Sequence, residues 1–227
     1  MVDFNDTKAS YRASIEKSIG FAGKDHDFFI AAKAEHLVRL IREHAPGLAT
    51  PKVLDVGCGH GLIHPYLAEQ GFDVVGVDVA TEVLDLAREA NPGVAYLGFD
   101  GSKLPFDAAT FDVAVAICVM HHVPPAQWTE FLREMRRVVK PGGIAIVFEH
   151  NPYNPLTRYV VATNEMDRGV KLLSSSHLQK LMRDVGLGVH DRFILFTPFA
   201  HPFFRWLDGK LGWCPMGAQY YVAATVP

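Results

Sequence analysis

Three glycines at alternate positions and two acids further along the chain are the residues best suited to hold a ligand. Gly57, Gly59 and Gly61 lie in the stretch VLDVGCGHG, where they follow a short apolar run. Asp78 ends the stretch VVGVD, 21 residues after Gly57, and Asp100 ends the stretch YLGFD. A glycine turn lets a ligand approach the backbone because no Cβ is in the way, and a carboxylate can accept hydrogen bonds from ribose hydroxyls. One adenosine could span all three features.

The segments between these residues indicate an α/β fold. Helical patterns begin near Leu62, Thr81, Pro125 and Ser174. Short apolar runs predict strands at 52–56, 73–77, 94–99, 111–119 and 144–148. Strands that alternate with helices predict a doubly wound, mostly parallel sheet with helices on both faces. Ligands bind at the carboxyl edge of such a sheet, where the glycine turn and both acids would meet.

The two ends of the chain depart from this alternation. A helix over 175–185 is followed by VHDRFILF and AQYYVAATV, two strand-like segments with no helix pattern between them, which predicts an antiparallel pair at the sheet edge. Residues 1–50 are expected to form a helical appendage, and residues 51–227 the ligand-binding domain. The segments 150–173 and 198–217 are the least generic, and we expect them to shape the substrate site.

Composition excludes several classes of protein. The 227 residues, 49% of them apolar, suit one globular domain, and a net charge of −3 gives no general attraction to nucleic acid. Three widely spaced cysteines predict neither a disulfide framework nor a zinc site. The amino terminus does not look like a signal peptide, and no apolar run reaches the roughly 18 residues that a membrane-spanning helix needs. We therefore expect a cytoplasmic protein.

The order of the motifs resembles a known family. Leu62 stands where a dinucleotide-binding turn would carry its third glycine, so the NAD pattern is not met. The chain is instead similar to the class I S-adenosylmethionine-dependent methyltransferases over residues 52–149. The matching stretches are VLDVGCGHG, VVGVDVA, GFDGSKLPF, FDVAVAICVMHHV and LREMRRVVKPGGIAIVFE. This resemblance implies a seven-stranded sheet whose last strand is antiparallel, and S-adenosylmethionine as cofactor with S-adenosylhomocysteine as product.

The resemblance also assigns residues to the methionine end of the cofactor. Asp55 and the glycine turn, with Gly57, Cys58, Gly59 and Gly61, would hold that end. Buried cysteine usually behaves as a small apolar residue, so packing is the alternative for Cys58.

Other residues would hold the adenosine. Asp78 would bind the ribose hydroxyls, Val79 would lie against the adenine, and Asp100 and Gly101 would bond to the adenine ring. Cys118 would offer its backbone carbonyl to the methionine ammonium. The alternative for either acid alone is a cap on the helix that follows it.

A methyl transfer by in-line displacement needs a positioned nucleophile and, where that nucleophile carries a proton, a base. His121 and Glu149 follow the fourth and fifth strands and are the candidate catalytic residues, while His122 is a candidate substrate contact. A purely structural role is the alternative for each of them. Neither histidine has metal-ligating partners at helical spacing, so we expect no metal.

Further substrate contacts are expected outside the cofactor motifs. The proline-rich stretch NPYNPLTR predicts a rigid loop that carries Tyr153, Asn154 and Arg158, and Tyr11 could belong to a lid.

The acceptor is expected to be a small or lipid-like molecule. The segment 198–217 is rich in aromatic residues, which could pack as a satellite core, line an apolar pocket or touch a membrane. A nicotinamide-dependent oxidoreductase and a non-catalytic partner of an active methyltransferase remain the alternatives, and the oligomeric state is open.

Overall fold

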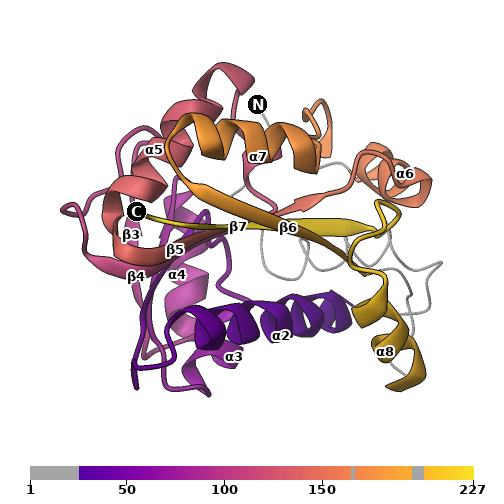
Figure 1. Ribbon diagram of the computed structural model, residues 1–227. Coiled ribbons are helices and arrows are strands. Elements are labelled where there is room, and N and C mark those ends of the chain that lie inside the picture. Colours follow the sequence, from indigo (N-terminus) through magenta and orange to yellow (C-terminus); the bar gives the residue numbers. More distant parts are fainter. Residues whose placement is uncertain (1–25, 165–166, 196–201) are drawn as a thin grey trace.

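The protein is built around one twisted sheet, which a computed structural model describes for residues 26–164, 167–195 and 202–227 (Figure 1). Within these ranges the sheet has seven strands in the order β3-β2-β1-β4-β5-β7-β6. The strands are β1 Lys52–Val56, β2 Asp73–Asp78, β3 Ala95–Gly98, β4 Phe111–Ile117, β5 Val139–His150, β6 Gly188–Ile194 and β7 Gln219–Thr225. The first five are parallel to one another, whereas β7 is antiparallel to both β5 and β6. The predicted fold class is confirmed.

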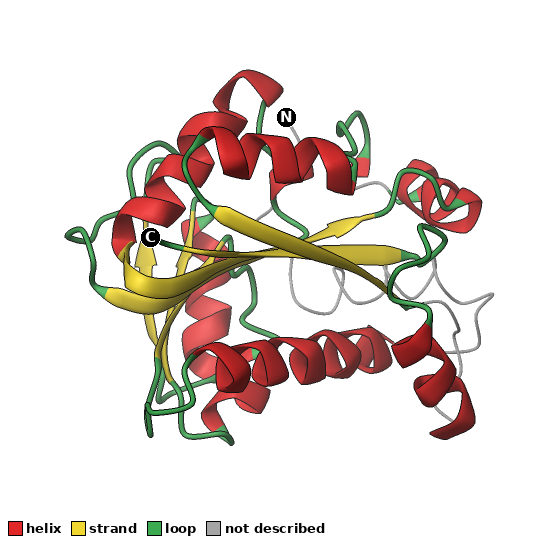
Figure 2. Cartoon of the chain, viewed as in Figure 1, coloured by secondary structure: helices red, strands yellow, loops and turns green. Residues whose placement is uncertain are grey.

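Helices cover both faces of the sheet (Figures 1 and 2). On one face lie α5 and α7, on the opposite face lie α2 and α3, and α6 and α8 stand near one end of the sheet. The helical segments are α2 His26–His44, α3 His64–Ala68, α4 Thr81–Ala90, η2 Met120–His122, η3 Pro125–Gln127, α5 Trp128–Val138, α6 Pro155–Thr163, α7 Ser175–Asp184 and α8 Pro202–Lys210. No helix in these ranges is long and apolar enough to cross a bilayer.

Two layers of apolar side chains hold the helices to the sheet. Leu54 of β1 belongs to the same apolar layer as Leu132 of α5 and Met182 of α7. Its neighbour Val53 faces the other side, in the layer that includes Leu37 of α2. Successive strand residues point to opposite faces, and both faces are covered, so the central strands are apolar without alternation.

Parallel pairing brings the functional motifs to one edge of the sheet. Val56 at the end of β1 pairs in register with Val77 of β2, so the turn at Gly57 lies beside Asp78. On the other side β1 pairs with β4, whose end leads into Cys118. The carboxyl edge predicted from the sequence is therefore assembled as expected.

Three local predictions were wrong. Strand β5 begins at Val139 rather than residue 144, because it continues through the KPGG stretch where its register with β4 shifts. Helix α8 lies between β6 and β7, where the sequence showed no helix pattern.

The third error concerns NPYNPLTR, which was predicted to be a loop throughout: residues 151–154 do form a turn, but residues 155–158 begin α6. Asn154 caps this helix by accepting a hydrogen bond from the Thr157 N–H at 3.0 Å, and Pro155 follows at the first helical position. A proline is favourable there because its missing N–H has no intrahelical partner to lose.

Candidate active site

A cavity of about 380 Å³ opens at the carboxyl edge of the sheet. The glycine turn and Asp78 form part of its wall, and Ile30 and Lys33 of α2 form another part. Further lining comes from the segment after β4, including Cys118 and His122. Elements far apart in the sequence thus enclose one site, and Lys33 is a member that the motifs did not indicate.

The glycine turn is shaped by positive backbone dihedrals. Gly57, Gly59 and Gly61 have φ of 76°, 50° and 64°, in the region that side chains disfavour. A Cβ at Gly57 would lie 2.6 Å from the Val119 side chain, whereas a Cβ at Gly59 would meet nothing within 4 Å. Gly57 is therefore required by packing, while the open side of Gly59 lies at the cavity wall.

Asp55 offers an unused acceptor at this wall. Its Oδ2 lies 3.0 Å from His64 Nε2, and His64 Nδ1 lies 2.6 Å from the Tyr96 hydroxyl. Its Oδ1 is buried and has no hydrogen-bond partner among the described residues. A buried carboxylate oxygen without a donor is unfavourable in the free protein and suits a cationic ligand group such as an ammonium.

Sequence reasoning missed His64 and Tyr96, which hold Asp55 in place. Both side chains are buried, and Asn91 adds a hydrogen bond to the Tyr96 hydroxyl at 3.0 Å. His64 could have been found from the sequence, because it is a histidine in the first turn of the helix that follows the glycine motif, nine residues after Asp55.

Asp78 braces the glycine turn from the neighbouring strand. Its carboxylate accepts hydrogen bonds from the N–H groups of Gly59 at 2.8 Å and Ala80 at 2.9 Å. Burial raises the pKa of Asp78, although these two backbone donors counteract the rise. A carboxylate can accept about four hydrogen bonds, so capacity remains for ligand hydroxyls.

Two of the three predicted adenine contacts line the cavity, and the third does not. Val79 and Gly101 line the cavity, but Asp100 is not among the lining residues. The exposed Asp100 carboxylate accepts hydrogen bonds from the hydroxyl and N–H of Ser102 and the N–H of Lys103, and these bonds lower its pKa. Its role toward an adenine amino group stays a prediction.

The surroundings of the two cysteines of the site disfavour the thiolate form. Burial raises the pKa of Cys58 and of Cys118, which makes both poor nucleophiles. Cys118 has a φ of 57°, a left-handed conformation that is uncommon for a side-chain-bearing residue and is often found at ligand sites. Its N–H donates to the Phe148 carbonyl at 2.8 Å, which ties the end of β4 to β5.

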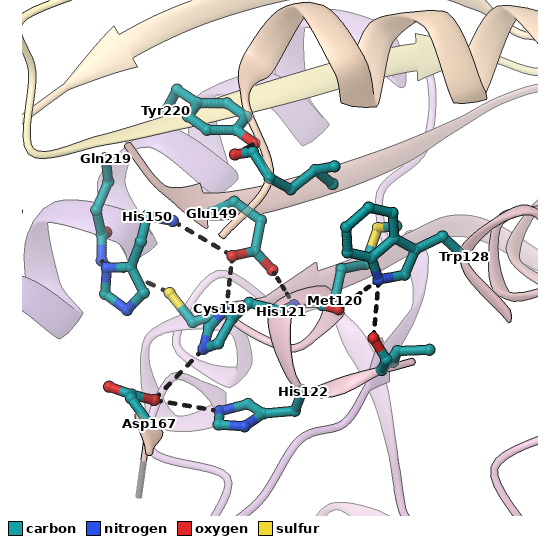
Figure 3. A network of polar contacts seen from close by, with 12 residues as sticks. Cys118, Met120, His121, His122, Trp128, Glu149, His150, Asp167, Gln219 and Tyr220 are labelled. Carbon is teal, nitrogen blue, oxygen red and sulfur yellow. Dashed lines mark hydrogen bonds and ion pairs between the residues drawn. The ribbon is translucent and has the colours of Figure 1, made fainter. Parts of the chain in front are cut away.

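His121 and Glu149, the predicted catalytic pair, are in direct contact (Figure 3). His121 Nδ1 lies 2.6 Å from Glu149 Oε2, and both side chains are buried. Burial alone would lower the pKa of His121, but the Glu149 charge and the hydrogen bonds of Glu149 and Asp167 hold it well above its ordinary value. Burial would likewise raise the pKa of Glu149, yet His121 keeps it below the usual range. Of the two neighbouring histidines, His122 is the one that lines the cavity.

The other predicted substrate contacts are not brought to the cavity wall. Tyr153 and Arg158 are exposed, and the Asn154 amide is used within the protein, because its Nδ2 donates to the Met216 carbonyl at 2.7 Å while its Oδ1 caps α6. Tyr11 lies outside the described residues.

Comparisons with known proteins agree with this geometry. A family model described as a methyltransferase domain matches residues 54–147. The ubiquinone biosynthesis O-methyltransferase of Aliivibrio fischeri is 33% identical over 196 residues, which is 82% of this chain and 77% of that protein. An uncharacterized methyltransferase of Synechocystis is 38% identical over 104 residues, 45% of this chain. That match spans 49% of the Synechocystis protein, so the chain covers about half the length of this relative.

Solved structures share the fold. An S-adenosylmethionine-dependent methyltransferase from Mesorhizobium loti superposes with a TM-score of 0.60 at 23% identity, covering 82% of this chain and 96% of that chain. A phosphoethanolamine N-methyltransferase from Haemonchus contortus, solved with S-adenosylmethionine, has a TM-score of 0.60 at 17% identity over 85% of this chain and 52% of that chain.

An open, doubly wound sheet with a ligand cavity at its carboxyl edge is typical of the Rossmann-like class of α/β proteins. Within that class, the chain belongs to the family of class I S-adenosylmethionine-dependent methyltransferases. The residues fit the cofactor chemically, since the cavity wall carries the unpaired buried Asp55 Oδ1, which suits an ammonium, and the Asp78 carboxylate, which suits hydroxyls. The nicotinamide-dependent alternative is not supported.

Proposed function

We propose that the protein transfers the methyl group of S-adenosylmethionine to a hydroxyl group of a small, lipid-like acceptor. The unsatisfied buried Asp55 Oδ1 is the observation that carries the cofactor part of this proposal. Asp55 would bind the methionine ammonium and Asp78 the ribose, which leaves the side of the cavity near Ile30, Lys33 and His122 for the acceptor.

The chemistry requires little activation by the protein. The sulfonium of the cofactor loses its positive charge as the methyl group leaves, so the residues must position the acceptor oxygen and exclude water. An acceptor hydroxyl must also lose its proton, and two imidazole side chains, His60 and His122, line the cavity; an imidazole is a side chain that can accept a proton near neutral pH. The Aliivibrio fischeri relative, an O-methyltransferase by name, supports oxygen as the atom methylated.

Exposed apolar side chains support a lipid-like acceptor. Nine large apolar side chains are exposed in the described part of the chain, and six of these lie within 153–216: Tyr153, Leu156, Tyr159, Trp206, Trp213 and Met216. Asn151 and Asn154 connect the start of α6 to the loop after α8 by hydrogen bonds to Pro215, Met216 and Gly217. Large exposed apolar patches mark contacts with proteins, ligands or membranes, and a lipid or its membrane is the contact that we propose for these side chains.

The test measures binding and turnover separately. Calorimetric titration should show binding of S-adenosylmethionine and S-adenosylhomocysteine but not NAD. Turnover would then be followed as S-adenosylhomocysteine release and methyl-ether formation with a catechol and with the same ring carrying an alkyl chain. We expect the alkylated catechol to have the lower KM. Methylation of amines alone would contradict the O-methyl assignment, and binding without any turnover would favour a non-catalytic partner.

A further inference from the structure

A cluster of histidine and carboxylate side chains lies beside the cofactor cavity and is only partly used by the proposed reaction (Figure 3). His121 and His122 come from the short helix η2 after β4, and Asp167 comes from the segment that follows α6. One carboxylate oxygen, Asp167 Oδ1, lies 3.5 Å from His121 Nε2 and 3.4 Å from His122 Nε2. Three ligand-type atoms from two distant segments therefore converge, within 4.8 Å of one another.

We propose that His121, His122 and Asp167 bind one divalent transition-metal ion. The two separations that involve the Asp167 carboxylate suit such an ion. Good hydrogen bonds between nitrogen and oxygen are about 2.7–3.2 Å long, so the contacts of 3.4 and 3.5 Å are long hydrogen bonds, which a bound ion would replace. A tetrahedral site with bonds of about 2.0–2.1 Å has ligand atoms about 3.3–3.4 Å apart. The two separations from Asp167 Oδ1 thus match two edges of a tetrahedron with an ion at its centre, while the two histidine nitrogens lie within 4.8 Å of each other.

Glu149 supplies the support that metal-bound histidines normally have. A ligating imidazole usually donates its second N–H to a carboxylate, which fixes the ring and makes the other nitrogen a better ligand. Glu149 Oε2 lies 2.6 Å from His121 Nδ1, which leaves Nε2 directed toward Asp167. Glu149 is fully buried and also accepts from the His121 N–H at 3.3 Å, so its carboxylate is held in place.

The composition of the cluster indicates the kind of ion. Two imidazoles and one carboxylate suit zinc, iron, cobalt or nickel better than magnesium or calcium, which prefer oxygen ligands. Three protein ligands leave a coordination position open, as in catalytic rather than structural zinc sites. His122 is 23% exposed and lines the cavity, so the open position would face the space assigned to the acceptor.

The sequence predicted no metal because neither histidine has another metal-ligating residue near it at helical spacing. Asp167 lies more than 40 residues after His122 in sequence and reaches it only through the fold. The site goes beyond the proposed methyl transfer, and ion binding is measurable without any acceptor.

The first experiment uses the purified protein, without affinity-tag histidines and freed of metal with a chelator, titrated with Co²⁺ alone. We expect one Co²⁺ per chain, with the visible absorption of a tetrahedral nitrogen and oxygen site, displaced by Zn²⁺. Absence of this absorption would overturn the proposal. A sulfur-to-cobalt charge-transfer band would also overturn it, because it would place a cysteine among the ligands.

Variants then assign the ligands. Asp167→Asn and His122→Gln should each weaken Co²⁺ binding by at least tenfold, and Glu149→Gln by about 10- to 100-fold. The matched control is His190→Gln, because His190 stacks on His44 with ring centroids 5.6 Å apart and forms a second histidine pair. Unchanged affinity in Asp167→Asn, or lost affinity in His190→Gln, would refute the assignment.

Two further measurements keep the result interpretable. Circular dichroism of each variant in chelator reports whether the variant is folded. Where a variant does not fold, the wild-type cobalt spectrum alone tests the metal site. Titration with S-adenosylhomocysteine in chelator reports the cofactor site separately. Cofactor binding without metal binding would overturn only the metal site, whereas metal binding without cofactor binding would overturn only the proposed function.

Discussion

Replacing Asp78 by Asn should weaken cofactor binding much more than it weakens the fold. Asp78 uses one carboxylate oxygen for the Gly59 N–H and the other for the Ala80 N–H. The Asn side chain keeps one acceptor oxygen but turns the other position into a donor, so one of these backbone groups loses its acceptor and the ribose loses a charged one.

The size of the effect follows from the loss of a charge-assisted hydrogen bond. Such a bond contributes about 1.5–3 kcal/mol, which corresponds to a roughly 10- to 150-fold higher Kd. The loss of stability should be smaller. Burial raises the pKa of Asp78, so its ionised form is unfavourable in the free protein, and removing the charge offsets part of the lost backbone bond.

The assay is calorimetric titration with S-adenosylhomocysteine, accompanied by urea unfolding. Asp73→Asn is the matched control, because Asp73 is an exposed acid at the opposite end of the same strand, β2. We expect the control to bind like the wild type. If Asp78→Asn also bound with the wild-type Kd, the placement of the ribose beside Asp78 would be wrong.

Four other substitutions test separate parts of the structure. Gly57→Ala, with its Cβ 2.6 Å from Val119, should lose about 2–4 kcal/mol of stability in urea unfolding, whereas Gly59→Ala should lose about 1–2 kcal/mol but bind S-adenosylhomocysteine more than tenfold less tightly. Asn154→Ala should lose about 1 kcal/mol through the missing cap, with cofactor affinity unchanged in calorimetry. Glu134→Gln should lose about 2 kcal/mol at pH 7. Hydrogen bonds from Arg137 lower the pKa of Glu134, so its contribution is present above the ordinary value of 4.5 and lost at lower pH; the difference from wild type should shrink in unfolding measurements below pH 4.5. A constant difference would contradict the role of its charge.

The central sheet could be predicted because its strands carry a strong local pattern. Residues of β1 and β4 are buried on both faces, so each strand is a short apolar run bounded by turn residues. The glycine turn was equally recognisable, since Gly57 and Gly61 occupy backbone conformations that other residues disfavour.

The other features of the fold and the site depend on tertiary contacts, which no local sequence pattern reveals. Asp167 belongs to a segment without helical or strand periodicity, and it lies beside His122 only in the folded chain. In α6 the prolines were counted as helix breakers, although Pro155 stands at the one helical position where a proline is favourable. His64 was overlooked because its importance comes from its contact with Asp55 rather than from its place in the motif.

The position of β7 imposes an order on how the chain can fold during synthesis. β7 lies between β5 and β6, and β6 pairs with no other strand of the described sheet. The ribosome completes β6 at Ile194, 25 residues before it reaches Gln219, the first residue of β7. During that interval the edge of β5 is open and β6 has no neighbour to pair with, and open strand edges favour aggregation. A nascent chain stalled before Gln219 should therefore depend on chaperones far more than one released after Thr225.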